Sequence, residues 1–149
     1  MLSRPTTDQA IEGVIRALDD TVLAAVGEGP AGVAVQMARQ ILRGCAVRAA
    51  HEIAWMHEEI AAICRLAERT DAPAVRVALD ALGALDTTSL HLADVQVRYD
   101  RAGEVLSCVV DAAFAAADAA LTAAAREVLE ARSAHEMEIV GQLDLVGRG

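Results

Sequence analysis

The sequence has no lysine and very few aromatic residues. All 13 basic residues are arginine, against 22 acidic residues, and the formal net charge is −9. The whole aromatic set is Trp55, Tyr99 and Phe114, so the core must be built from Ala, Val, Leu, Ile and Met. Basic patches supply most of the affinity for nucleic acids and for anionic membranes. We therefore expect no nucleic-acid partner and no membrane partner for this acidic chain.

Long apolar runs and a cysteine framework are also missing. No uncharged apolar run reaches the ~18–20 residues that a membrane span needs, and the nearest one, 112–125, is interrupted by Asp118. The first ten residues lack the basic and apolar regions of a signal peptide, so a cytoplasmic location is expected. Cys45, Cys64 and Cys108 are odd in number and widely spaced. They are typical of free, buried thiols rather than of disulfides or a zinc site.

The length and the periodicity predict one all-α domain. A chain of 149 residues has the usual length of a single domain, and we expect it to span 1–149 with frayed ends at 1–5 and 141–149. No run alternates with the period of two that is typical of a strand. The three- and four-residue spacing of apolar positions indicates helices over 7–26, 31–70 and 90–139, with a shorter one from Pro73.

Local signals place the helix ends. The expected N-cap of the first helix is Thr6 or Thr7, and the expected N-cap of the third helix is Asp71. The cap region expected for the last helix is 86–89. Gly44 is the expected weak point of the 31–70 helix. The pattern does not decide whether the 31–70 and 90–139 helices are continuous or kinked.

The expected fold is an elongated antiparallel bundle of about four helices, two of them long. The 31–70 helix carries one continuous apolar stripe: Met37, Ile41, Cys45, Ala49, Ile53, Met56, Ile60, Ile63 and Ala67. At 1.5 Å per residue, a helix of this length measures ~60 Å. Apolar stripes longer than the bundle would be covered by a second copy, so the pattern predicts a homodimer.

One segment of this helix concentrates the candidate functional residues. Arg48, His51, Glu52, Trp55, Glu58 and Glu59 are the candidates for a ligand site or an interface. Spacings of three and four place Arg48, Glu52, Trp55 and Glu59 on one helix face, and His51, Trp55 and Glu58 on the neighbouring face. Two interpretations stay open: an ordinary solvated face with an Arg48–Glu52 ion pair, or titratable groups around a tryptophan that serves as a pocket floor or interface anchor.

Motifs for catalysis, metals and phosphates are absent. No histidine stands in the Glu-x-x-His spacing of di-iron bundles, and no catalytic residue, metal ligand or cofactor is predicted. A site assembled across helices from His51, His91 and His135 is the remaining metal alternative. The glycine-rich segment 27–32 lacks the Gly-Lys-Ser/Thr ending of a phosphate-binding loop, so we interpret it as a structural turn.

The opening Arg4-Pro5-Thr6-Thr7-Asp8-Gln9-Ala10, the 18–23 segment and the amphipathic second helix resemble a family of small helical bacterial proteins of unknown function. Its members are encoded beside aminoglycoside-phosphotransferase-like kinases and acyl-CoA-dehydrogenase-like flavoproteins. The likeness covers the first half of the chain and transfers no functional residue. It implies an accessory or partner role around acyl-CoA metabolism.

These observations favour a non-enzymatic helical-bundle protein that acts through protein–protein association, as a homodimer, as an accessory partner, or both. The alternative is a bundle or enzyme that binds a small molecule in a pocket around Trp55. A metal-binding bundle is the third hypothesis.

Overall fold

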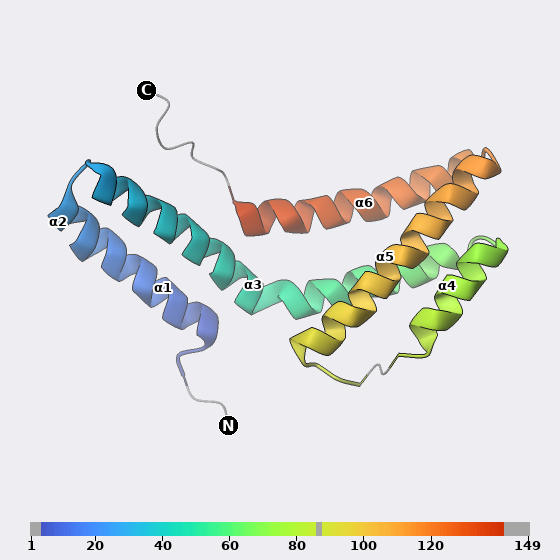
Figure 1. Cartoon of the computed structure of the whole chain (residues 1–149), viewed down its shortest axis with the longest axis horizontal. Helices are drawn as coiled ribbons and strands as arrows, with labels where there is room; N and C mark the ends of the chain where they lie inside the picture. The colour runs from blue at the N-terminus through green and yellow to red at the C-terminus, as the bar shows by residue number, and fades with distance from the viewer. Residues whose placement is uncertain (1–3, 86–87, 142–149) are drawn as a thin grey trace. The chain divides into compact units, whose positions relative to one another are not determined.

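The computed structural model describes residues 4–85 and 88–141, and this part of the chain is all-helical and contains no strand. The elements in chain order are α1 (Thr7–Ala17), η1 (Leu18–Leu23), α2 (Ala24–Val26), α3 (Pro30–Ala67), α4 (Pro73–Gly83), α5 (Leu92–Ala115) and α6 (Ala119–Val140). Figure 1 shows their order along the chain. The all-α prediction is therefore confirmed. Most of the expected frayed ends and part of the 86–89 cap region lie outside the described residues.

The helices form two compact units, which we describe separately. Unit 1 takes its described residues from 4–52 and 135–141, and unit 2 from 53–134. Both α3 and α6 contribute residues to each unit.

The first helical segment of unit 1 begins and ends where the sequence predicts, but it contains a π-helix. Thr6 is the N-cap, and its backbone N–H donates to the Gln9 side chain at 3.2 Å. The wider π-turn η1 follows directly after α1. Within η1, Asp19 forms a half-buried ion pair with Arg39 of α3. This contact ties the first helical segment to α3.

Two glycines of α3 mark close approaches in unit 1. A Cβ atom on Gly32 would lie 2.0 Å from the carbonyl oxygen of Gly27, so the turn before α3 requires glycine there. A Cβ atom on Gly44 would lie 2.9 Å from the carbonyl oxygen of Ile139 in α6. The Gln40 side chain donates to the carbonyl oxygen of Val140 at 2.9 Å. Gly44 therefore lies where α6 packs closely against α3.

Only part of the apolar stripe predicted for α3 is buried. Ile60, Ile63 and Ala67 belong to the core, but Met37 and Ile41 are 60% and 66% exposed. Cys45 and Ala49 are exposed as well, so within the chain the stripe is covered only in the second half of α3. The reason lies in unit 1, where the inner side of α3 is marked instead by residues spaced seven apart: buried Gly32, ion-paired Arg39 and buried Ala46.

The expected single helix over 90–139 is wrong, because the chain reverses between α5 and α6. Ala117 has a φ of 50°, and the Asp118 N–H donates to the carbonyl oxygen of Ala113 at 2.9 Å. This arrangement ends α5 in a Schellman motif. Asp118 then caps α6, because its carboxylate accepts the backbone N–H of Leu121 at 2.9 Å.

The cap predicted at Asp71 is also wrong. α4 begins at Pro73, as expected for a proline in a first helical turn, but its N-cap is Ala72. Asp71 pairs instead with Arg76, and the Ala72 N–H donates to the Thr70 hydroxyl at 3.3 Å.

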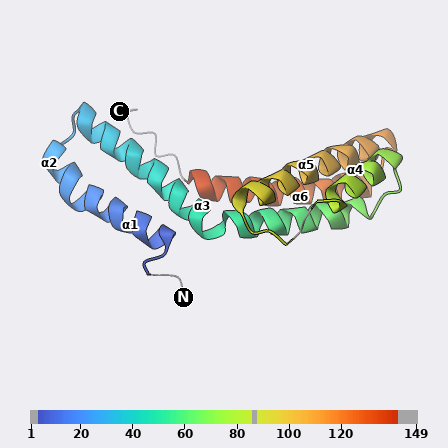
Figure 2. The ribbon, with the colours of Figure 1, turned by 60° about the horizontal axis from the view of Figure 1, so that its bottom comes forward.

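Unit 2 contains the hydrophobic core, which four helices share. In both views, α4, α5 and the adjoining parts of α3 and α6 lie alongside one another (Figures 1 and 2). The largest fully buried side chains of the described residues are Ile63, Val75, Val95, Val105 and Val109. The core continues into α6 at Leu121, Ala124 and Ala125. Its small side chains let the helices approach closely without large voids.

Candidate functional site

The six candidate residues all lie on α3, in a segment that both units share. Arg48, His51 and Glu52 belong to unit 1, and Trp55, Glu58 and Glu59 belong to unit 2. Arg48, His51 and Glu58 are exposed, Glu52 and Trp55 are half-buried, and Glu59 is buried. Glu59 is thus the one candidate residue whose side chain belongs to the buried part of the structure.

In unit 1, the ion pair predicted between Arg48 and Glu52 is present. Arg48 donates to Glu52 across one helical turn. Pairs of this kind on an exposed helix contribute a few tenths of a kcal/mol, ~0.3–0.5. This ion pair therefore adds little stability, and a ligand site or interface at these residues stays a prediction.

In unit 2, Glu59 takes part in a buried polar contact that joins three helices. Its carboxylate accepts a hydrogen bond from the hydroxyl of Tyr99 in α5, although Glu59 is only 7% exposed. The guanidinium of Arg132 in α6 lies 5.0 Å from the centre of the Tyr99 ring, within the range of a cation–π interaction. The structure thus brings Glu59 together with two residues that the sequence analysis did not select.

No local signal could have found this cluster. Glu59 and Tyr99 are 40 positions apart, and only the packing of α3 against α5 brings them together. The single tyrosine was visible in the composition, but its partner was not. A buried carboxylate that accepts a hydrogen bond from a tyrosine is a satisfied polar group in the core. A ligand or interface role of Glu59 stays a prediction.

Three of the pockets that the described residues outline can be compared with the pocket predicted around Trp55. One pocket lies between α5 and α6, bounded by residues from Val110 to Leu129, and a wider hollow adjoins it. Another lies near the start of α5, beside Leu85 and Arg98. None of these is lined by a candidate residue of α3, so the Trp55 site stays a prediction.

Metal ligands and reactive thiols give no further candidate. Within residues 4–85 and 88–141, no group of three or more His, Cys, Asp or Glu side chains is placed to hold a metal ion. His91 is the exposed N-cap of α5. All three cysteines are free, as predicted, but Cys45 is exposed and the other two are half-buried, so the expectation of buried thiols is wrong. Burial raises the pKa of the Cys64 thiol, which lowers its reactivity.

Comparisons of the chain with protein-family models, with curated proteins and with solved structures found no match. The family resemblance of the first half therefore stays a prediction. Among the described helices, none combines the length and the apolar character needed to cross a membrane.

Proposed function

We propose that the protein acts through protein–protein association, and that it forms a homodimer through an exposed apolar face of α3. We call Ala34, Met37, Ala38, Ile41 and Cys45 the α3 apolar face. All five are exposed, and their spacings of three and four place them on one side of the helix. The observation that carries the proposal is the exposure of Met37 and Ile41, at 60% and 66%.

The packing of unit 1 supports the need for a partner. Its buried residues, among those described, are only Ile15, Gly32 and Ala46. Two of these three are very small, so unit 1 buries little apolar surface. Exposed apolar side chains that gather on one helix face are typical of interaction sites.

The chemistry of the face favours a second copy as the partner. The α3 apolar face itself contains no charged residue. Two copies can therefore meet along it without burying an unpaired charge, which is costly. Ala34 and Ala38 are small and allow two helix axes to come close. A two-fold symmetric dimer needs a patch that complements itself, and an uncharged helical stripe meets this condition.

An extension of the face adds apolar area. The end of α6 packs beside α3, where the Val140 carbonyl oxygen accepts the Gln40 amide. Val140 itself is 46% exposed. A symmetric contact that includes this edge buries apolar groups from two helices of each copy.

Sedimentation equilibrium at micromolar concentration tests the proposal. We expect a particle of twice the 15.6 kDa chain mass. Replacing Ile41 with Asp removes two buried isoleucines per dimer. At ~1.5–3 kcal/mol each, this costs about 3–6 kcal/mol and raises the dissociation constant at least a hundredfold.

The matched control is Val77→Asp. Val77 is 70% exposed on α4 in unit 2, so the change has the same chemistry outside the α3 apolar face. We expect Val77→Asp to dimerise like the wild type. A monomeric wild type, or equal weakening by both variants, would overturn the proposal.

A further inference from the structure

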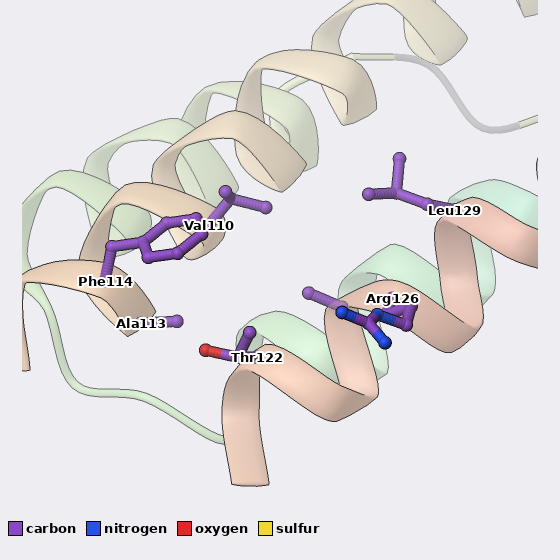
Figure 3. A pocket seen from close by; sticks show the side chains of 7 residues that line it. Val110, Ala113, Phe114, Thr122, Arg126 and Leu129 are labelled. Atoms are coloured by element: carbon purple, nitrogen blue, oxygen red, sulfur yellow. The ribbon is translucent and has the colours of Figure 1, made fainter. Parts of the chain in front are cut away.

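The pocket between α5 and α6 has apolar walls and one cationic side chain. Val110 and Phe114 come from α5 and Leu129 from α6, and all three line a cavity of about 180 Å³ (Figure 3). Ala113 and Ala125, which also line it, belong to the buried core. The pocket therefore rests on the packed part of unit 2.

The walls leave large apolar groups exposed around the opening. Phe114, the only phenylalanine of the chain, is 70% exposed, and Leu129 is 45% exposed. A cavity of about 150 Å³ lined by apolar residues holds a benzene ring. The pocket thus has room for one aromatic ring or a short alkyl chain, and not for a large cofactor.

The polar lining comes from successive turns of α6. Thr122 and Arg126 both line the pocket (Figure 3), and Arg126 takes part in none of the ion pairs found among the described residues. A guanidinium offers two parallel N–H donors that match a carboxylate. The hydroxyl of Thr122 already donates its hydrogen to the backbone carbonyl oxygen of Asp118 at 2.8 Å, so of these two residues Arg126 supplies the donors for a ligand.

The surroundings of Arg126 restrict the charge of a ligand. Arg126 also lines the wider hollow beside the pocket, together with Glu127 and Glu130. Two carboxylates near one guanidinium repel a ligand with several negative charges, such as a nucleotide. A single carboxylate avoids most of this repulsion.

We propose that this pocket binds a small monocarboxylate with an apolar body, such as a benzoate. The ring lies between Phe114 and Leu129, and the carboxylate accepts hydrogen bonds from the guanidinium of Arg126. All of these residues belong to unit 2, so the site is independent of the α3 apolar face.

The test is fluorine NMR titration of the full-length chain with 4-fluorobenzoate, and with 4-fluorobenzyl alcohol as the uncharged analogue. We expect saturable binding of 4-fluorobenzoate in the millimolar range. Arg126→Gln should weaken 4-fluorobenzoate about tenfold and leave the alcohol unchanged, because only the carboxylate uses the guanidinium. Phe114→Ala should weaken both probes, and the exposure of Phe114 means that this change empties no core space.

The matched control is Arg101→Gln. Arg101 pairs with Glu104 on α5 and does not line the pocket. This variant should bind 4-fluorobenzoate like the wild type. The proposal is overturned if the wild type shows no saturation up to ~10 mM, where a millimolar site would be mostly filled. It is also overturned if Arg126→Gln binds as the wild type does, or if both arginine variants lose affinity equally.

Discussion

The hydrogen bond between Tyr99 and Glu59 gives the sharpest stability prediction. Replacing Tyr99 with Phe deletes one hydroxyl group and keeps the ring that packs in unit 2 and lies 5.0 Å from the Arg132 guanidinium. The change therefore removes the hydrogen bond to the Glu59 carboxylate and largely preserves apolar packing.

The expected cost follows from the burial of Glu59. At 7% exposure, its carboxylate has little access to water that could replace the lost donor. A hydrogen bond to a charged group contributes ~1.5–3 kcal/mol to stability. We expect a loss of about 2 kcal/mol in the free energy of unfolding. For a chain of this length, that lowers Tm by about 4–8 °C.

Urea unfolding followed by circular dichroism at 222 nm measures this loss, and a double-mutant cycle assigns it to the pair. Glu59→Leu alone removes the carboxylate that accepts the Tyr99 hydrogen bond, whereas Glu59→Leu with Tyr99→Phe removes both groups of this hydrogen bond. Replacing both partners with apolar groups of similar shape is nearly neutral. The double variant should thus be more stable than the sum of the single losses predicts, by ~1–2 kcal/mol. Additivity within ~0.3–0.5 kcal/mol, the scatter of independent sites, would refute the assignment.

Three further predictions concern backbone space, the α6 cap and the cysteines. Gly32→Ala should destabilise the fold, because its Cβ atom would lie 2.0 Å from a backbone oxygen. Gly103→Ala in α5 should stabilise it by ~0.5–1 kcal/mol, because a Cβ atom there meets nothing within 4 Å. The urea midpoint of unfolding should therefore fall for Gly32→Ala and rise for Gly103→Ala, and equal shifts would contradict the reasoning. Asp118→Ala removes the 2.9 Å hydrogen bond that caps α6 and should lower the free energy of unfolding by ~1 kcal/mol. An unchanged thermal midpoint of unfolding would disprove this. Exposed Cys45 should react with Ellman's reagent at pH 8 before Cys64, because the raised pKa of Cys64 leaves less of its thiolate at that pH. Peptide mapping after brief labelling measures the order of reaction, and earlier labelling of Cys64 would count against this prediction.

The helices could be predicted from local sequence signals, and the errors in the predicted helix ends have local causes. Pro30 and Pro73 begin α3 and α4, as expected from the tolerance of proline in a first turn. The turn between α5 and α6 was missed because Ala117 adopts the left-handed conformation that glycine usually takes. In a run of alanines, only Asp118 signals the new helix, and the same residue also interrupts the apolar run 112–125.

The candidate site, too, was predicted where it depends on contacts within one helix and missed where it depends on contacts between helices. The Arg48–Glu52 ion pair depends on helix spacing alone and was predicted correctly. Glu59 was selected for its neighbours along α3, yet its partner is Tyr99 in another helix. The pocket beside Arg126 was missed because it exists only where the chain reverses and α6 returns along α5.

The sequence by itself therefore determined the all-α class, most helix boundaries, the acidic charge and the free state of the cysteines, because these depend on composition and on contacts within a few residues. The tertiary structure alone decided which apolar stripe is covered. Spacing shows that Met37 and Ile41 share a face with each other, but not which side of α3 the rest of unit 1 covers. In unit 1 the side marked by Gly32, Arg39 and Ala46 is covered, and the α3 apolar face stays exposed. Burial is a property of the neighbours that a helix meets, and those neighbours are distant in the chain.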